Sequence, residues 1–168
     1  QKNDGYGAAI IEGIKTVRTK YFCIFNADGS FNPEELKTMI NKIKKERLDL
    51  VFGSRYEKEG GSEDDTFVTL IGNYFFTTLG KIIFQLNISD ILYTYVIGKT
   101  NSFKSLNLKS DDFCLCVEIP INAVRLKHLF TDFPSFERKR IAGKKKVNEF
   151  VDGFKILFFM IKKFIHLK

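Results

Sequence analysis

The sequence predicts an α/β domain in which helices flank a mostly parallel β-sheet. Within the first 55 residues, two amphipathic helical patterns alternate with two apolar strand patterns, and the connections have the length of parallel crossovers. Both strand patterns end in short polar turns, at residues 26–29 and 53–55. Ligands bind beyond the carboxyl ends of the strands in such sheets, so the sequence places a candidate site at this edge.

The four elements of this first part are defined by their apolar spacing and by turn residues. Gly5 and Gly7 lead into a helix whose apolar residues recur at helical spacing. Residues 21–25 form an unbroken apolar strand, and Asn32 provides a capping residue at the start of a second helix. Residues 48–56 predict the next strand.

Two later segments are amphipathic and rich in Phe, Ile and Leu. Residues 67–88 are long enough to cross a bilayer, but polar side chains repeat every four positions, namely Thr69, Asn73, Thr77 and Lys81. We expect this helix to pack in the core or to lie on a membrane surface, and we favour both over a span. Residues 154–168 predict a basic amphipathic helix that either meets anionic lipid or docks on its own domain. We therefore expect a domain of residues 1–150 and a C-terminal helix of residues 151–168.

Composition restricts the classes of partner and of site. The formal charge of +7 favours an anionic partner, whether nucleic acid, a phosphate-bearing substrate or an acidic membrane surface. Cys23, Cys114 and Cys116 are too few for a disulfide scaffold, and with only two histidines, His128 and His166, they do not form a zinc pattern. We expect buried structural thiols.

Asn26 and Asp28, at the end of the first strand, are candidate metal ligands. Mg²⁺ and Mn²⁺ bind oxygen ligands, and one or two carboxylates plus substrate phosphates are usually enough. The alternative interpretation is a plain Asx turn at Asp28. Arg55 is predicted at the same sheet edge, where a guanidinium can hold a phosphate.

A basic segment near the C-terminus is a second candidate for phosphate binding. Six cations surround Gly143 within nine residues: Arg138, Lys139, Arg140, Lys144, Lys145 and Lys146. Such a run is usually a solvated face, but the central glycine indicates a loop shaped to close over a ligand.

Six segments, in this order and spacing, resemble family 2 glycosyltransferases of the GT-A (Rossmann-like) fold. They are NDGYGAAIIEGI, FNADGSFNPEEL, VFGSRY, SDILYTY, FCLCVEIPINA and ERKRIAGKKKV, and the resemblance covers residues 3 to about 153. It is closest to the polyprenyl-phosphate branch, which includes dolichol-phosphate mannose synthases. The opening P-x-x-N-E strand of that family is not in this chain, so we expect an N-terminally truncated GT-A domain.

The resemblance implies roles for particular residues. The aspartate motif of the family maps onto Asn26 and Asp28, with Asn in the first position, and its acceptor motif survives only as Asp90. Asp90 would orient the acceptor or a basic side chain, or act as the base for a hydroxyl acceptor. The predicted residues are Gly5, Gly7, Asn26, Asp28 and Ser30 for the donor; Arg55, Arg140 and Lys146 for the acceptor phosphate; Asp28 and Asn26 for Mg²⁺ or Mn²⁺; and Asp28, Asp90 and Arg55 for catalysis.

The implied function is inverting transfer of a sugar from a UDP- or GDP-sugar to a polyprenyl or dolichyl phosphate. It would take place at the cytoplasmic face of a membrane, with no nucleic acid as partner. Three alternatives stay open: a family 2 transferase with a saccharide hydroxyl as acceptor, a transferase that binds without turnover, and a non-catalytic basic module for anionic lipid or nucleic acid. The sugar, the nucleotide, the lipid and the oligomeric state are not specified by the sequence.

Overall fold

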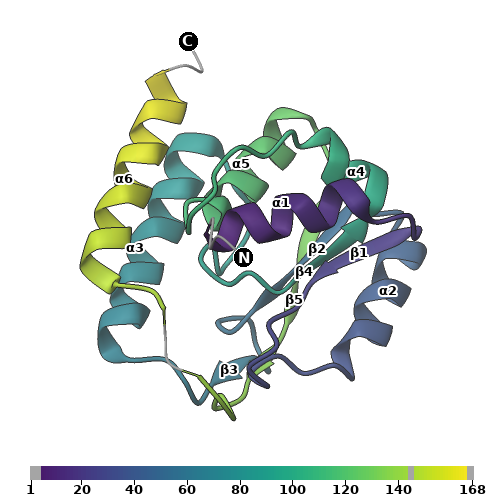
Figure 1. Ribbon diagram of the computed structural model, residues 1–168, viewed down its shortest axis with the longest axis horizontal. Coiled ribbons are helices and arrows are strands. Elements are labelled where there is room, and N and C mark those ends of the chain that lie inside the picture. The colour runs from purple at the N-terminus through teal and green to yellow at the C-terminus, as the bar shows by residue number, and fades with distance from the viewer. Residues whose placement is uncertain (1–4, 144–145, 166–168) are drawn as a thin grey trace.

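The computed structural model describes residues 5–143 and 146–165 of the 168-residue chain. Its elements alternate between helices and strands along most of the sequence, as Figure 1 shows. In chain order they are α1 (Tyr6–Thr16), β1 (Tyr21–Ile24), α2 (Glu35–Glu46), β2 (Leu50–Ser54), β3 (Gly61–Ser62), α3 (Phe67–Phe84), β4 (Val96–Lys99), α4 (Thr100–Ser105), α5 (Leu115–Arg125), β5 (Phe130–Pro134), β6 (Phe136–Glu137) and α6 (Glu149–Ile165).

The main sheet has four strands in the order β1-β4-β2-β5. β2 pairs in parallel with β5, whereas β4 lies between β1 and β2 and runs antiparallel to both. β1, β2 and β5 therefore share one direction, and residues 26–28 and 55 leave the sheet at the same edge. The predicted α/β class with flanking helices is confirmed, but the antiparallel β4 and the small parallel β3–β6 pair were not predicted.

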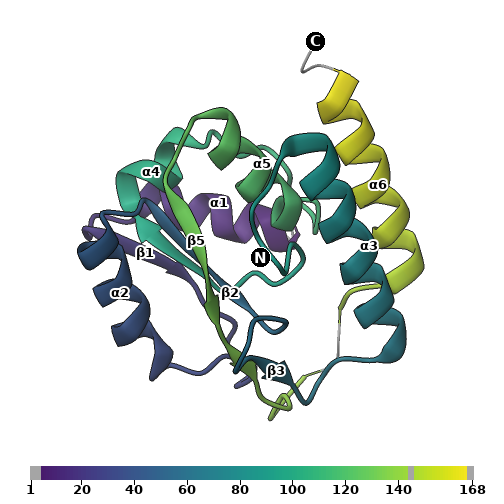
Figure 2. The ribbon, with the colours of Figure 1, turned by 180° about the vertical axis from the view of Figure 1, so that it is seen from behind.

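Helices cover both faces of the sheet and create two cores. Val51 points toward the face covered by α2, while its neighbours Leu50 and Phe52 point toward the opposite face, as expected for alternating strand side chains. That opposite core is the larger one and includes residues from α1, α3, α4, α5 and α6. Figures 1 and 2 show α2 alone on its side, and α3 beside α6 at one end of the molecule.

The predicted helix starts are close to the observed ones. α1 begins at Tyr6, directly after Gly5. α2 begins at Glu35 and not at Asn32, whose side-chain oxygen instead accepts a hydrogen bond from the backbone N–H of Glu34 in the preceding turn. Asn32 therefore stabilises the turn that leads into the helix.

α3 turns its polar residues toward the protein interior. Asn73 and Thr77 are buried, and their side-chain oxygens accept hydrogen bonds from the backbone N–H groups of Leu92 (3.1 Å) and Ile91 (3.2 Å). Those N–H groups lie in an irregular segment, where backbone donors need other partners. Asn73 and Thr77 thus satisfy backbone donors of the core, whereas apolar residues of the same helix such as Phe67, Ile71 and Tyr74 are exposed.

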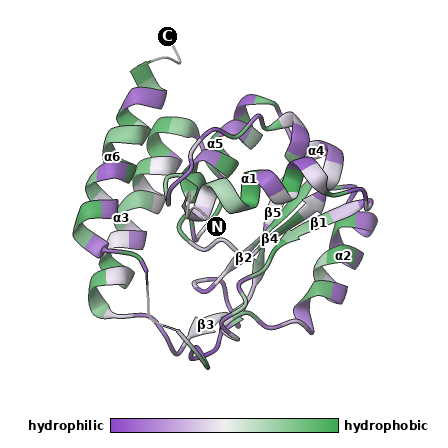
Figure 3. Ribbon diagram, in the orientation of Figure 1, coloured by the Kyte–Doolittle hydropathy of each residue, from purple (hydrophilic) through white to green (hydrophobic). Residues whose placement is uncertain are grey.

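Hydrophobic residues predominate along both α3 and α6 (Figure 3). Among the described residues, α3 is the one helix that is long and apolar enough to cross a bilayer, a criterion that core helices also meet. α6 confirms the predicted helical tail, although His166 lies outside the described residues.

Candidate functional site

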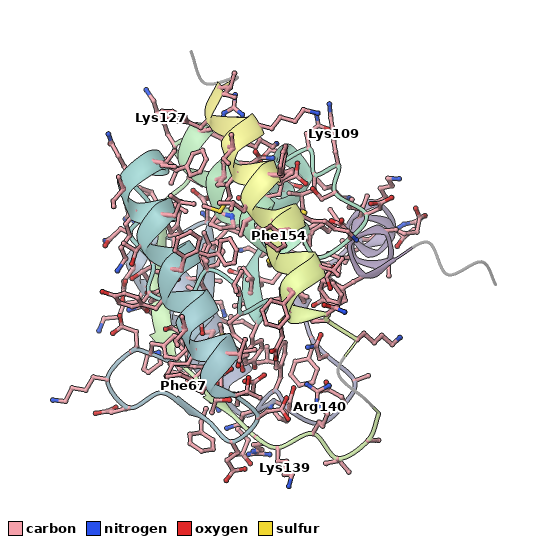
Figure 4. All side chains as sticks on the ribbon, turned by 90° about the vertical axis from the view of Figure 1, so that its left-hand side faces the viewer. Phe67, Lys109, Lys127, Lys139, Arg140 and Phe154 are labelled. Carbon is pink, nitrogen blue, oxygen red and sulfur yellow. The ribbon has the colours of Figure 1, made fainter. Side chains whose placement is uncertain are left out.

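A cavity of about 590 Å³ lies where the strands β1 and β2 end. Its charged part is lined by residues from the sheet edge, from the loop before α3 and from the basic loop after β6. Its apolar part reaches the helices and includes Leu92, Phe113, Val147 and Ile156. Figure 4 shows Arg140 at the end of the molecule where α3 begins with Phe67.

Asp28 lines this cavity from the turn after β1. Its Oδ1 accepts hydrogen bonds from the backbone N–H (3.0 Å) and the hydroxyl (2.8 Å) of Ser30, so the Asx turn is present. Its Oδ2 faces the guanidinium of Arg140 at 3.9 Å. The turn fixes one carboxylate oxygen and leaves the other toward the cations of the cavity.

Asn26 also lines the cavity, and its amide oxygen has a partner. The Tyr6 hydroxyl donates a hydrogen bond to Asn26 Oδ1 (3.2 Å) and lies 2.7 Å from Thr94 Oγ1. The Tyr6 ring stacks on Phe113 with ring centres 5.1 Å apart. Burial raises the pKa of Tyr6 to about 12, so this hydroxyl keeps its proton at neutral pH.

Arg55 stands at the predicted edge, but its guanidinium is buried among three carboxylates. Nε and Nη2 donate to Asp90 at 2.7 and 3.0 Å, and Nη1 donates to Asp65 (2.9 Å) and Glu137 (3.1 Å). Burial alone would lower the pKa of Arg55, but the charges of Asp90, Glu137 and Asp65 raise it well above its usual value. The group therefore stays charged, and every guanidinium nitrogen has a protein partner.

The basic loop after β6 is held against the turn that carries Asp28. The backbone N–H of Ile141 donates to the carbonyl of Asp28 (2.8 Å), and that of Arg138 donates to the carbonyl of Ser30 (2.9 Å). A Cβ on Gly29 would lie 2.6 Å from the Ile141 side chain, so glycine permits this close approach.

Arg140 brings a cation from this loop into the cavity. Its guanidinium pairs with Asp64, with Nη2 to Oδ2 at 2.5 Å, and the hydrogen bonds with Asp64 raise the pKa of Arg140. Lys146 lines the cavity too, whereas Lys144 and Lys145 of the same run lie outside the described residues.

Four predicted site residues have other contacts in this structure. A Cβ on Gly5 or Gly7 would lie 2.3 or 2.2 Å from the backbone oxygens of Asp111 and Ser110, so both glycines allow close helix–loop packing and do not line the cavity. Ser30 is buried and orients Asp28. Their assignment to the donor stays a prediction without support from these contacts.

Asp90 is the fourth of these residues. It is buried, does not line the cavity, and uses both carboxylate oxygens on Arg55. This geometry agrees with the expectation that Asp90 orients a basic side chain, here Arg55. Its role as the base for a hydroxyl acceptor stays a prediction.

The residues at the sheet edge fit a divalent cation only in part. The described residues contain no group of three or more His, Cys, Asp or Glu side chains suited to a metal. Asp28 offers Oδ2, but the oxygen of Asn26 is already bonded to Tyr6. Because Mg²⁺ is commonly held by one carboxylate together with substrate phosphates, the set fits a cation that is bound along with a diphosphate.

The cysteines have the structural character that the sequence predicts. The described chain contains no disulfide, and Cys114 and Cys116 are buried. Burial raises the pKa of Cys23 to about 12, so its thiol stays protonated.

Several residues of the site were not identified from the sequence. Asp64 and Asp65 fall in the polar loop between β3 and α3, and Glu137 adjoins the basic run. A buried arginine needs carboxylate partners, so an expectation that Arg55 is buried could have directed attention to these acidic residues. Tyr6 lay between two glycines, and nothing in its pattern indicated contact with Asn26.

Comparison with known proteins identifies a matching family and a distant relative. The model of the family "Glycosyl transferase family 2" matches residues 1–106, more than half of the chain. The chain is also 23% identical, over 159 residues, to the low-salt glycan biosynthesis hexosyltransferase Agl6 of Haloferax volcanii. That alignment covers 94% of this chain but 38% of the relative, so the chain spans well under half of that protein's length.

Proposed function

Because this chain belongs to glycosyl transferase family 2, we propose that it forms the catalytic site of an enzyme that transfers a sugar from a UDP- or GDP-sugar to a lipid-linked phosphate. The family and the α/β fold support glycosyl transfer in general, and the relative is named as a hexosyltransferase. The donor, the acceptor and the use of metal are the parts that we propose.

The observation that carries the proposal is the pairing of charges in the cavity. Among the described residues, four carboxylates line it, and each faces an arginine: Asp28 and Asp64 face Arg140, and Asp65 and Glu137 face Arg55. None of these four is left as an unpaired base. A phosphate acceptor is already ionised at pH 7 and needs no strong base, whereas a saccharide hydroxyl would.

The same residues are arranged to assist departure of a nucleoside diphosphate. Asp28 would hold a Mg²⁺ or Mn²⁺ ion that arrives with the donor, and this ion would neutralise charge that develops on the diphosphate. Arg140 and Lys146 line the cavity and stabilise the same charge electrostatically. The acceptor phosphate would attack the anomeric carbon from the side opposite the leaving group, with inversion.

A membrane surface fits the outward side of two helices, which we call the α3/α6 apolar face. Its exposed residues are Phe67, Leu70, Ile71, Tyr74, Phe75 and Ile82 of α3, and Phe150, Val151, Phe154, Phe158, Ile161 and Ile165 of α6. Large exposed apolar patches mark sites of protein or membrane contact. Lys81, Lys155 and Lys162 are exposed on the same helices and would meet anionic headgroups.

The cavity and the α3/α6 apolar face share the same helices. Thr69, in the first turn of α3, and Ile156, near the middle of α6, both line the cavity. A protein that rests on lipid through this face would hold its cavity close to the headgroups. This placement supports a lipid-linked acceptor and a location at a membrane surface, which we propose to be the cytoplasmic face.

The test is a transfer assay with the full-length protein. UDP- and GDP-sugars are offered with a polyprenyl phosphate in the presence of Mg²⁺ or Mn²⁺. We expect Asp28→Ala to lower the rate by about 100-fold or more, because it removes the proposed metal ligand. Asp111→Ala, an exposed carboxylate outside the cavity, is the matched control and should keep the parental rate. Equal rates for the two variants would refute the assignment of Asp28, and transfer to a saccharide hydroxyl in place of the lipid would refute the acceptor.

A further inference from the structure

Asn26 stands where the aspartate motif of the family has its first carboxylate. Its contacts show which of its amide atoms can bind a ligand. An amide offers one acceptor oxygen and one N–H₂ donor group. Tyr6 uses the oxygen, through the hydrogen bond of 3.2 Å to Oδ1. The amide nitrogen has no hydrogen-bond partner among the described residues, and Asn26 lines the cavity.

Tyr6 is itself held in place from two sides. Thr94 Oγ1 lies 2.7 Å from its hydroxyl, and Phe113 stacks on its ring. Since Tyr6 donates its only proton to Asn26, the Thr94 hydroxyl must donate to Tyr6. This chain of hydrogen bonds selects one orientation of the Asn26 amide.

We propose that Tyr6 positions Asn26 as a hydrogen-bond donor to the donor diphosphate, so that Asp28 is the single protein ligand of the cation and the cation binds only together with a diphosphate. An amide oxygen that already accepts a proton from a hydroxyl is a poor metal ligand. An N–H₂ group without a partner among the described residues, on a side chain that lines the cavity, suits a phosphate oxygen. The inference rests on the proposed donor site and adds the roles of Tyr6 and Asn26 to it.

The surroundings of Asp28 agree with a cation that needs the diphosphate. Ser30 occupies Oδ1, and the positive charge of Arg140 lies 3.9 Å from Oδ2. A divalent cation bound alone at Asp28 Oδ2 would be repelled by the charge of Arg140, because no phosphate would be present to offset this repulsion. A cation that carries a diphosphate brings the negative charge that both Arg140 and the Asn26 N–H₂ group can bind.

The first test measures binding, with inorganic pyrophosphate as the probe for the diphosphate. Titration of the full-length protein with Mn²⁺, followed by electron paramagnetic resonance, should show weak binding alone and at least tenfold tighter binding with pyrophosphate. Asn26→Asp adds a second carboxylate and should bind Mn²⁺ alone at least tenfold more tightly than the parent. Equally tight Mn²⁺ binding by the parent with and without pyrophosphate, or no gain in Asn26→Asp, would overturn the proposal.

The second test isolates Tyr6 by a double-mutant cycle. Pyrophosphate affinity is measured by calorimetry in EDTA for Tyr6→Phe, Asn26→Ala and the double variant. Each single change should weaken binding by about fivefold, the effect of one hydrogen bond, and the double variant should lose no more than Asn26→Ala alone. Additive losses would show that Tyr6 does not act through Asn26.

A matched control removes a similar hydroxyl elsewhere. Tyr95→Phe removes the hydrogen bond of 2.7 Å to the carbonyl of Asn32, outside the cavity, and should leave pyrophosphate affinity unchanged. If Tyr6→Phe does not fold, Asn26→Asp still decides the question. If pyrophosphate binds as predicted but no sugar is transferred from any donor, the proposed function alone is refuted. If sugar is transferred but the losses of pyrophosphate affinity in Tyr6→Phe and Asn26→Ala are additive, this inference alone is refuted.

Discussion

The sheet edge and the α3/α6 apolar face both reverse the usual distribution of polarity, in opposite ways. At the sheet edge, Arg55 is buried among Asp90, Asp65 and Glu137. On the α3/α6 apolar face, Phe67 and Phe158 are each 75% exposed. The first region brings charge inside, and the second leaves aromatic rings outside.

The difference shows which region supplies its own partners and which does not. Burying ions is costly unless they are paired, and at the sheet edge the protein supplies the partners itself. Exposed apolar side chains gain their stabilisation only from something that removes them from water, and the described residues supply nothing there. The charges at the sheet edge are thus paired before a ligand binds, whereas the α3/α6 apolar face is removed from water only when a partner covers it.

The largest expected effect concerns Arg55. Arg55→Ala leaves three carboxylates without their cation, and we expect the free energy of unfolding to fall by about 3 to 5 kcal/mol. Urea denaturation measures this loss. Arg138→Ala, a change at an exposed arginine that bonds to Asn32, is the control and should cost less than about 0.5 kcal/mol. A similar small loss for Arg55→Ala would show that its pairs do not hold the sheet edge together.

The next effect concerns the α3/α6 apolar face. The double variant Phe154→Ser and Phe158→Ser should bind phosphatidylglycerol-containing vesicles about 10- to 100-fold more weakly, because two rings no longer enter the lipid. Its stability should hardly change, since both rings are exposed in the protein alone. Co-sedimentation with vesicles measures the binding. Leu129→Ser, an exposed apolar residue outside the two helices, should leave binding unchanged, and an equal loss there would contradict a role specific to this face.

Asp132 is a charge near the sheet edge whose partners are incomplete. Its Oδ2 accepts hydrogen bonds from Ser89, while its buried Oδ1 has no partner within the part of the chain that the structure describes. Burial raises the pKa of Asp132 from 3.8 to about 6. A raised carboxylate pKa means that the stabilisation from this group is complete below about pH 4 and is lost as the pH rises through 6. Asp132→Asn should therefore match the parent near pH 4 and be more stable by about 2 to 3 kcal/mol at pH 8. Stability curves that stay parallel from pH 4 to pH 8 would contradict this.

The smallest expected effect compares two threonines of α3. Thr77→Val removes the acceptor of the Ile91 N–H inside the core and should cost about 1 to 2 kcal/mol. Thr78→Val, one position away and only partly buried, should cost less than about 0.5 kcal/mol. Thermal unfolding of both variants measures the difference. Equal stabilities would show that the inward polar residues of α3 contribute nothing to the core.

Much of the fold could be predicted because its local signals are strong. The apolar strands at residues 21–25 and 48–56 and the helical spacing of α1, α2, α3 and α6 all lie within single segments. The position of β4 between β1 and β2 could not be predicted, because strand order depends on contacts between distant residues. The spacing in α3 showed two faces but not which one would be buried, since Asn73 and Thr77 meet the Leu92 and Ile91 backbone only in the folded chain.

The site was predicted in part for the same reason. Asp28, Arg140 and Lys146 do line one cavity, because strand ends and a basic loop can be located from sequence. The partners of Arg55 could not be identified, because Asp65, Asp90 and Glu137 are 10, 35 and 82 positions away. Tyr6 and Asn26 are separated by 20 positions and meet only when α1 packs beside β1.

The most direct test of the account combines the two regions in one assay with the full-length protein. Sugar transfer is measured to a short, water-soluble polyprenyl phosphate and to a long-chain polyprenyl phosphate embedded in anionic vesicles. We predict that Asp28→Ala loses transfer to both acceptors, while the Phe154→Ser and Phe158→Ser double variant loses transfer only to the embedded one. Transfer by Asp28→Ala at the parental rate, or equal loss of both acceptors in the double variant, would contradict the account.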